Sequence, residues 1–231
     1  MLKEERYDKI IEILNEETYI DAHTLAEKLY VSMPTIRRDL SYLAGKSLIV
    51  RSHGGAKKVS TDRIVTPLNY RKTLNSSEKK KIAKNAVELI KDDDIIFIDA
   101  STTALFMGEF LSEKKGVIVV TNGIPLSVIL AEKGIKTYCT GGQIQKSSLA
   151  YTGDFTQMFI KNFNFDICFF SCHALDENGK ISDTSLEENL VRITAIKNAK
   201  KSVFLCDSSK IGLSAPYNLL NAEDIDIILN E

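Results

Sequence analysis

The C-terminal part of this chain contains five short apolar runs that alternate with stretches of helical periodicity. The runs are IIFI at 95–98, VIVV at 117–120, IKTYC at 135–139, DICFF at 166–170 and SVFLC at 202–206. Strands that alternate with helices are joined by right-handed crossovers, so they lie parallel in one sheet with helices on both faces. The sequence therefore predicts a mostly parallel α/β domain, to which residues 225–229 would add a last strand.

Polar residues and glycines directly follow each predicted strand. A ligand of such a sheet binds beyond the carboxyl ends of the strands, so these residues are candidates for a binding site. One such cluster alone is more typical of a helix cap or a turn, whereas several at one edge favour a pocket. Free backbone amides here suit a phosphate or a carboxylate, and Lys210 would supply positive charge. The clusters are DASTT at 99–103, TNG at 121–123, TGG at 140–142, SCH at 171–173 and DSSK at 207–210.

The first 58 residues follow another pattern, which predicts three short amphipathic helices. The first helix has apolar residues at i, i+3, i+4 and i+7, and Asp21 caps the second. A turn at Val31 and Ser32 precedes the third helix, which Ser32 caps and whose first turn accommodates Pro34. The side chains predicted to be buried are Tyr7, Ile10, Ile11, Leu14, Leu25, Ala26, Leu29, Ile36, Leu40 and Leu43.

The third helix carries two adjacent arginines on the side opposite its apolar residues. A rotation of about 100° per residue gathers Thr35, Arg38 and Tyr42 on that face, flanked by Arg37 and Ser41. A short helix, a tight turn and a helix with exposed arginines form the geometry that lays a recognition helix in the major groove. A lone arginine pair is more typical of a solvated surface, but the surrounding pattern favours DNA binding.

Residues 47–56, SLIVRSHGGA, predict a β-hairpin wing after the third helix. Its Arg51 and His53, followed by Lys57 and Lys58, would lie near the DNA backbone or the minor groove. The whole chain has a formal net charge of −1, yet residues 28–58 contain seven basic residues and one acidic residue, Asp39. Basic charge is therefore concentrated where DNA would be contacted.

These motifs resemble those of the DeoR family of bacterial regulators. The stretch LAEKLYVSMPTIRRDLSYLAGKSLIVRSHGGA contains the family's VS..TIRRDL and R.HGGA patterns. Later motifs, including DASTT, TNG, GG, SCHALDENGKISDTSLEEN and DSSK, resemble the family's sensor domain. That domain is similar in fold to ribose-5-phosphate isomerase, glucosamine-phosphate deaminase and the CoA transferases. We therefore expect a winged helix-turn-helix over 1–58, a linker over 59–77 and an effector-sensing α/β domain over 78–231.

Two sets of site residues follow. The helical face and the hairpin give the DNA-contacting candidates Ser32, Thr35, Arg37, Arg38, Tyr42, Arg51 and His53. The resemblance implies an effector site lined by Asp99, Ser101, Thr102, Thr103, Asn122, Gly141, Gly142 and Lys210, with Glu188 as a weaker candidate. Ser101 departs from the glycine that the family usually has in this loop. Two interpretations stay open: the loop binds a different effector, or the serine hydroxyl donates to the anion.

The resemblance implies a sequence-specific DNA-binding regulator rather than an enzyme. It favours a repressor of a sugar-catabolic operon that a phosphorylated sugar metabolite controls. One alternative is a sugar-phosphate isomerase with a DNA-binding module, in which Asp99, Glu188 and Lys210 would be the acid and base groups. Another is an architectural DNA-binding protein whose second domain only oligomerises. Symmetric operator half-sites would require a homo-oligomer, a dimer or a tetramer.

No metal or other cofactor is expected. The four cysteines fall within or beside apolar runs, which predicts that they are reduced core residues. Cys168, Cys172 and His173 could form a metal site, but they lack the CxxC or HxxxH spacing of one. The charged N-terminus and the lack of about 20 consecutive apolar residues predict a cytoplasmic protein with no membrane segment.

Overall fold

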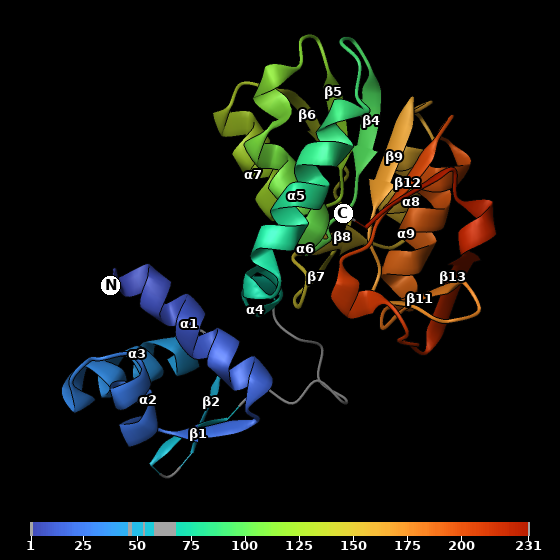
Figure 1. The fold of residues 1–231 in the computed structure, drawn as a ribbon. Helices are drawn as coiled ribbons and strands as arrows, with labels where there is room; N and C mark the ends of the chain where they lie inside the picture. The colour runs from blue at the N-terminus through green and yellow to red at the C-terminus, as the bar shows by residue number, and fades with distance from the viewer. Residues whose placement is uncertain (1, 46–47, 53, 58–67, 231) are drawn as a thin grey trace. The chain divides into compact units, whose positions relative to one another are not determined.

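The computed structural model describes residues 2–45, 48–52, 54–57 and 68–230, shown in Figure 1. The chain divides into two compact units, Met1–Leu74 and Asn75–Glu231. Each unit has its own apolar core. The stretch predicted as a linker, 59–77, lies partly outside the described residues, but its described part contains helix α4 and the beginning of α5.

The N-terminal unit contains the three predicted helices and the predicted hairpin. Asp21 caps the second helix as predicted, because its carboxylate accepts hydrogen bonds from the backbone amides of His23 and Thr24. The predicted buried residues are in the core, although Tyr7 is only partly buried. The helices are α1 (Lys3–Glu16), α2 (Ala22–Lys28), α3 (Met33–Gly45) and α4 (Leu68–Thr73).

The hairpin strands β2 (Val50–Ser52) and β3 (Gly55–Lys57) are joined by a third strand that the sequence did not predict, β1 (Tyr19–Asp21). The strand order is β1-β3-β2, with antiparallel pairing throughout. A Cβ atom at Gly55 would lie 2.2 Å from the carbonyl oxygen of Ile20, so only glycine allows β1 to approach β3 this closely.

The C-terminal unit is built on a six-stranded parallel sheet that contains all six predicted strands. Its order is β14-β12-β9-β4-β5-β6, so the chain starts in the middle, runs to one edge, and returns to build the other half. The direction of winding reverses between β4 and β9, which is where ligands bind in sheets of this kind. The strands are β4 (Ile95–Ile98), β5 (Ile118–Thr121), β6 (Lys136–Cys139), β9 (Ile167–Phe170), β12 (Ser202–Leu205) and β14 (Ile227–Leu229).

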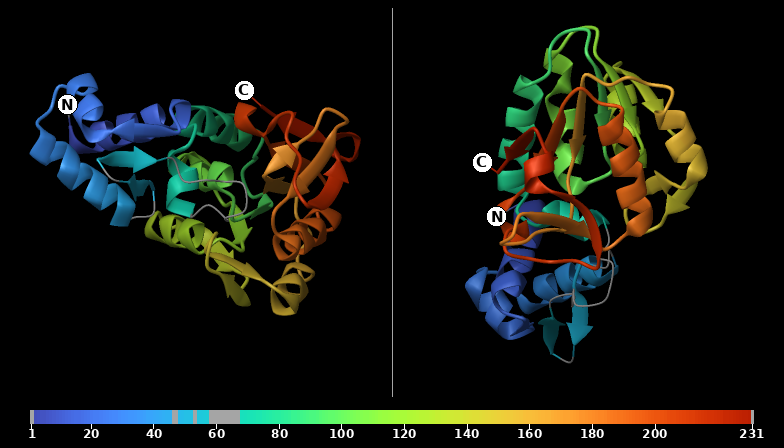
Figure 2. Two further views of the ribbon diagram at one scale, coloured as in Figure 1. Left: turned by 90° about the horizontal axis from the view of Figure 1, so that it is seen from below. Right: turned by 90° about the vertical axis from the view of Figure 1, so that its right-hand side faces the viewer.

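Helices cover both faces of this sheet (Figures 1 and 2). Ile96, Val119 and Phe169 face a core that includes residues of α5 and α7, whereas Phe97, Val120 and Phe170 face one that includes residues of α8 and α9. The helices are α5 (Ser76–Glu88), α6 (Thr102–Leu105), α7 (Ile124–Glu132), α8 (Asp154–Ile160) and α9 (Leu186–Lys197), with the short 3₁₀ helices η1 (Phe106–Glu109), η2 (Leu111–Glu113), η3 (Ser208–Lys210) and η4 (Ala222–Asp224).

Two small antiparallel sheets were not predicted. One is the hairpin of β7 (Gln143–Gln145) and β8 (Ala150–Thr152), and the other has the order β10-β11-β13. The strands of the second sheet are β10 (Ala174–Leu175), β11 (Lys180–Asp183) and β13 (Tyr217–Asn221). β7, β8 and β10 have only two or three residues, and β11 and β13 mix polar and apolar residues without a clear period of two.

One prediction about the core was wrong. Cys168, Cys172 and Cys206 are buried free thiols, as expected, but Cys139 is exposed. Cys139 ends β6, the edge strand of the sheet, where little packs against the side chains. Within the described ranges, no group of three or more His, Cys, Asp or Glu side chains is placed to hold a metal ion. No described helix is both long and apolar enough to cross a membrane.

Candidate functional sites

Helix α3 has one buried side and one exposed basic side. Ile36, Leu40 and Leu43 are completely buried, which anchors the helix to α1 and α2. Arg37 and Arg38 are exposed on the other side, as the helical period predicted. At the start of the helix the exposed Ser32 and the half-buried Thr35 share a hydrogen bond between their hydroxyls, 2.9 Å long.

The wing is attached to this helix through Arg51. Its Nη1 donates to the carbonyl oxygen of Arg37 at 3.3 Å and to the hydroxyl of Ser41 at 2.9 Å. The guanidinium of Arg51 therefore lies beside the exposed side of α3, which extends its basic surface. His53 lies outside the described residues.

Tyr42 is exposed on the same side but also packs against the first helix. Its ring stacks on Tyr7 with centroids 4.8 Å apart, and the ammonium of Lys3 lies 5.3 Å from its centroid. A hollow of about 360 Å³ opens beside this stack, lined by Lys3, Arg6, Tyr7, Thr35, Arg38, Asp39 and Tyr42. Tyr42 thus joins α1 to α3 and leaves part of its ring available for a contact.

The single acidic residue of segment 28–58 does not contribute to the exposed surface. Asp39 is buried, and its carboxylate accepts hydrogen bonds from Nε of Arg6 at 2.5 Å and Nη2 of Arg6 at 3.1 Å. The hydrogen bond to Asp39 raises the pKa of Arg6. The charge of Asp39 is therefore matched internally, and the exposed charge that this segment contributes is basic.

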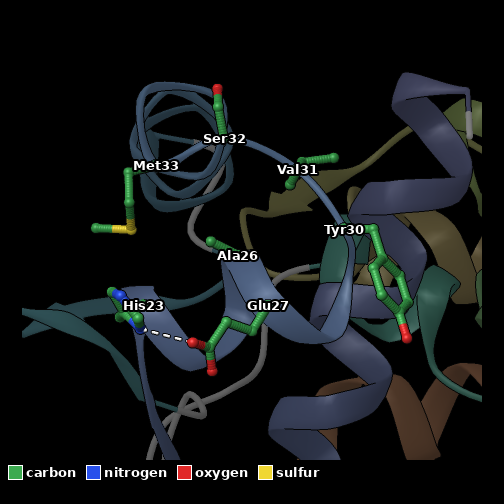
Figure 3. A pocket seen from close by; sticks show the side chains of 7 residues that line it. All are labelled: His23, Ala26, Glu27, Tyr30, Val31, Ser32 and Met33. Carbon is green, nitrogen blue, oxygen red and sulfur yellow. Dashed lines mark ion pairs between the residues drawn. The ribbon is translucent and has the colours of Figure 1, made fainter.

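A second hollow, of about 420 Å³, lies at the turn between α2 and α3 (Figure 3). His23 and Glu27 line it and lie 3.3 Å apart, but both side chains are mostly exposed. Tyr30 occupies the turn itself with a left-handed backbone, φ 53°, and is 96% exposed. The hollow is an open surface feature that lacks the burial of a ligand pocket.

In the C-terminal unit, the end of β4 is tied to the end of β9. Asp99 follows β4, and its carboxylate accepts hydrogen bonds from the backbone amides of Ser101 at 3.1 Å and Ser171 at 3.3 Å. It also accepts one from Nε of Arg192 at 2.9 Å. Asp99 therefore connects both sides of the point where the winding of the sheet reverses.

Arg192, which the sequence reasoning missed, is at the centre of a buried charge cluster. Its guanidinium pairs with Asp99, with Asp183 at 2.8 Å and with Glu188 at 3.2 Å. Burial alone would lower the pKa of Arg192, but the carboxylates outweigh this and raise it well above its ordinary value. Glu188 also accepts a hydrogen bond from the hydroxyl of Ser148 at 2.7 Å. The i, i+4 spacing of Glu188 and Arg192 was the only sequence signal for this cluster.

Lys210 joins the loops that follow three strands. Its ammonium lies 2.7 Å from the carboxylate of Asp207 and donates to the hydroxyls of Ser171 at 2.7 Å and Thr103 at 3.1 Å. Burial would raise the pKa of Asp207, but Lys210 and the hydroxyl of Ser209 outweigh this and hold it well below its ordinary value. The sequence-predicted Thr103 and Lys210 are thus in direct contact.

Ser101 caps helix α6, and its backbone conformation is one that residues other than glycine adopt readily. Its backbone has φ −71° and ψ 154°, and its hydroxyl accepts a hydrogen bond from the amide of Ala104 at 3.3 Å, which caps α6. Thr102 and Thr103, which follow in the first turn of α6, are buried.

The remaining candidates follow β5 and β6. Nδ2 of Asn122 donates to the carbonyl oxygen of Tyr151 at 3.0 Å, which identifies the opposite atom as the acceptor oxygen Oδ1. This Oδ1 and the hydroxyl of Thr140 are buried with no hydrogen-bond partner in the part of the chain that the structure describes. A Cβ at Gly142 would lie 2.2 Å from Oγ1 of Thr156, so this glycine is needed for packing against α8.

Family models match both units of the chain. The model of the DeoR-like helix-turn-helix domain matches residues 6–62, and that of the DeoR C-terminal sensor domain matches residues 74–231. The second match alone covers more than half of the chain.

Curated relatives align over nearly the whole chain. The HTH-type transcriptional regulator GolR of Listeria innocua is 32% identical over 98% of this chain and 90% of its own length. The lactose phosphotransferase system repressor of Staphylococcus epidermidis is 30% identical over 100% and 93%. The glycerol-3-phosphate regulon repressor of Escherichia coli is 28% identical over 100% and 92%.

Solved structures resemble the chain in fold alone. The eIF2B delta structure from Chaetomium thermophilum has a TM-score of 0.50 and 18% identity, over 70% of this chain and 57% of that one. Ribose 5-phosphate isomerase A from Methanocaldococcus jannaschii has a TM-score of 0.45 and 20% identity, over 59% and 55%. The chain spans little more than half the length of these proteins.

Proposed function

Because the chain belongs to the DeoR family of transcriptional regulators, we propose that it represses a sugar-catabolic operon and releases its operator when a phosphorylated sugar binds the C-terminal unit. The proposal for DNA rests on one observation, the exposed basic side of α3 with Arg51 attached to it. Ser32, Thr35, Arg37, Arg38, Tyr42, Arg51 and His53 are the proposed DNA contacts. The domain limits proposed are 1–58 and 78–231, with the linker between them.

The proposal for the effector rests on the convergence of polar groups at the strand ends. Lys210 would hold the phosphate by exchanging its hydrogen bonds to the hydroxyls of Ser171 and Thr103 for bonds to phosphate oxygens. Ser101 and Thr102 directly precede Thr103 at the start of α6. We propose that Asn122 and Thr140 bind the hydroxyl groups of the sugar. Oδ1 of Asn122 can only accept a hydrogen bond, and a sugar hydroxyl can donate one whereas an ionised phosphate cannot. Relatives named for glycerol-3-phosphate and for a lactose phosphotransferase system support this class of ligand.

The contacts of the acidic candidates favour binding over catalysis. The carboxylate of Asp99 accepts from two backbone amides and Arg192, while that of Glu188 accepts from Ser148 and Arg192. A general base of an isomerase must reach a proton of the substrate, but these oxygens are already engaged within the protein. We therefore propose that the site senses its ligand and does not convert it, and that Asp99 and Glu188 shape the site through Arg192.

The proposed function is tested by titrating operator DNA with the full chain in the presence of inorganic phosphate, glycerol 3-phosphate, ribose 5-phosphate and several hexose phosphates. At least one sugar phosphate should weaken operator binding by roughly 5- to 150-fold, the usual range of coupling between two sites. The same compounds are incubated with the protein and analysed for conversion. Conversion would support the isomerase alternative, and binding without any effect on DNA affinity would contradict the regulatory coupling.

Neutralising Lys210 should raise the effector concentration needed for a response at least tenfold while leaving operator binding intact. Since Lys210 forms an ion pair with the buried Asp207 at 2.7 Å, the pair Lys210→Met with Asp207→Asn keeps the charge balanced. Loss of a charged hydrogen bond predicts at least tenfold weaker binding of the sugar phosphate by calorimetry. The matched control is Lys200→Met with Asp166→Asn, a pair at the same distance whose lysine side chain is 74% exposed. Equal effector affinities in both double variants would show that Lys210 does not contact the effector.

Replacing Thr140 by valine should weaken effector binding without a loss of stability. The hydroxyl of Thr140 has no partner among the described residues, so its removal should not lower the free energy of unfolding of the unliganded protein. A lost hydrogen bond to a sugar hydroxyl predicts roughly three- to tenfold weaker binding, measured by calorimetry. Thr137→Val, in the strand β6 that Thr140 follows, is the control for effector binding; the hydroxyl of Thr137 donates to the carbonyl oxygen of Ile135 at 2.9 Å. Unchanged affinity would show that the sugar does not reach Thr140.

A further inference from the structure

The outer surface of α8 and α9 exposes large apolar side chains. Phe155 and Met158 of α8 are 79% and 61% exposed, and Leu186 and Leu190 of α9 are 46% and 42% exposed. The adjoining hairpin adds Ile144 and Leu149, which are 52% and 39% exposed. We call these six residues the α8–α9 surface.

These side chains belong to elements that lie side by side. Figure 1 shows α8 next to α9, and both helices contact β8. The hydroxyl of Thr194 on α9 is 3.3 Å from Oε1 of Gln157 on α8, and Ser148 in the hairpin donates to Glu188 on α9. The six residues therefore lie on adjacent elements of the C-terminal unit.

Helix α9 is apolar on both of its sides. Val191 and Ala195 are buried against the sheet, while Leu186 and Leu190 project from the opposite side. Large apolar side chains that gather in one exposed patch mark an interaction site.

Charges at the ends of the two helices indicate what covers this surface. Both helices carry an exposed acidic residue at the N-terminal end, Asp154 and Glu187, and an exposed lysine at the C-terminal end, Lys161 and Lys197. A twofold axis that lies in the interface and runs perpendicular to the helices would set each helix antiparallel to its mate, so that acidic ends face basic ends. The surface is therefore complementary to itself in both apolar character and charge.

We propose that the α8–α9 surface is the site where two copies of this chain pair about a twofold axis. The pairing does not depend on an effector being bound. It fits the proposed function because two recognition helices are needed to read two symmetric half-sites. The dimer would have Phe155 and Met158 at its centre, with the charged helix ends at its rim.

The test compares the full chain with the double variant Phe155→Asp/Met158→Asp by sedimentation equilibrium over a range of concentrations. Because each change occurs twice in a symmetric interface, the dissociation constant of the dimer should be at least a hundredfold higher in the variant. Val128→Asp, at a residue of α7 that is 51% exposed, is the control and should dimerise like the wild type. Circular dichroism should show the same fold in all three proteins, since the substituted side chains are exposed. A monomeric wild type, or a variant that dimerises as tightly, would overturn the proposal.

Charge reversal tests the twofold orientation. Asp154→Lys would place like charges opposite each other and should weaken the dimer by about two- to fivefold, the usual effect of an exposed ion pair. Adding Lys161→Asp should restore the affinity, because the pair is then reversed as a whole. Failure of the second change to restore it would contradict the antiparallel arrangement.

Operator titration separates this inference from the proposed function. The monomeric Phe155→Asp/Met158→Asp variant should bind a single half-site as tightly as the wild type but lose affinity for the palindrome. A wild type that dimerises through this surface yet binds no operator would contradict the proposed function and leave the interface standing.

Discussion

Replacing Arg192 by leucine is expected to lower the free energy of unfolding by about 3–5 kcal/mol, the range found when one partner of a buried ion pair is removed. The side chain of Arg192 is 5% exposed and pairs with Asp99, Asp183 and Glu188. Its removal leaves three carboxylates close together with no positive charge among them. Urea denaturation followed by circular dichroism measures the change.

Two further variants show whether the loss comes from this cluster. Arg192→Lys keeps one charge but not the fork that reaches three carboxylates, so its stability should fall between those of the leucine variant and the wild type. Lys200→Leu breaks an ion pair in which the lysine side chain is 74% exposed, and should cost less than about 1 kcal/mol. If Arg192→Leu were as mild as Lys200→Leu, the cluster would not hold the strand ends together.

Removing both arginines from the exposed side of α3 is expected to weaken operator binding by at least about thirtyfold. Each arginine that contacts a base or a phosphate contributes roughly 1–3 kcal/mol, and Arg37 and Arg38 are both exposed. The Arg37→Ala/Arg38→Ala variant should keep its melting temperature, because the helix is anchored by Ile36, Leu40 and Leu43. Fluorescence anisotropy with labelled operator measures the affinity.

The salt dependence of the same titration distinguishes the two kinds of contact. Loss of a phosphate contact lowers the slope of log affinity against log salt by about 1, whereas loss of a base contact weakens binding selectively at one base pair. Lys9→Ala, at an exposed position of α1, is the control. If the double variant bound every sequence as tightly as the wild type at physiological salt, this side of α3 would not be the DNA-contacting surface.

The parallel sheet was predictable because four of its strands, β4, β5, β9 and β12, are mostly apolar. Buried strands of this kind are recognisable by composition alone, and the ends of β4 were predicted to the residue. The small sheets were not predictable, because β10 has two residues and β7 and β8 have three each. Cys139 was assigned wrongly because no local pattern reveals that β6 is the edge strand.

The candidate sites were predictable only as far as local rules reach. The rotation of α3 follows from its own period, and the strand-end residues follow from the topology of a parallel sheet. The pairs Arg6–Asp39 and Asp99–Arg192 join residues that are 33 and 93 positions apart, so no spacing rule could find them. Whether the chosen residues contact DNA or an effector stays a prediction that the variants above test.

The hydrogen bond from Arg51 to the carbonyl oxygen of Arg37 bears on how operator preference can diverge. A backbone carbonyl is present whatever amino acid occupies position 37, so the residue proposed there to contact DNA can be exchanged while the wing keeps this anchor. Ser41 is the opposite case, because its hydroxyl is the second acceptor for Arg51 and disappears when the side chain changes. Duplicated copies of such a gene could therefore acquire new target sequences through position 37 one substitution at a time, whereas changes at position 41 would also loosen the hairpin.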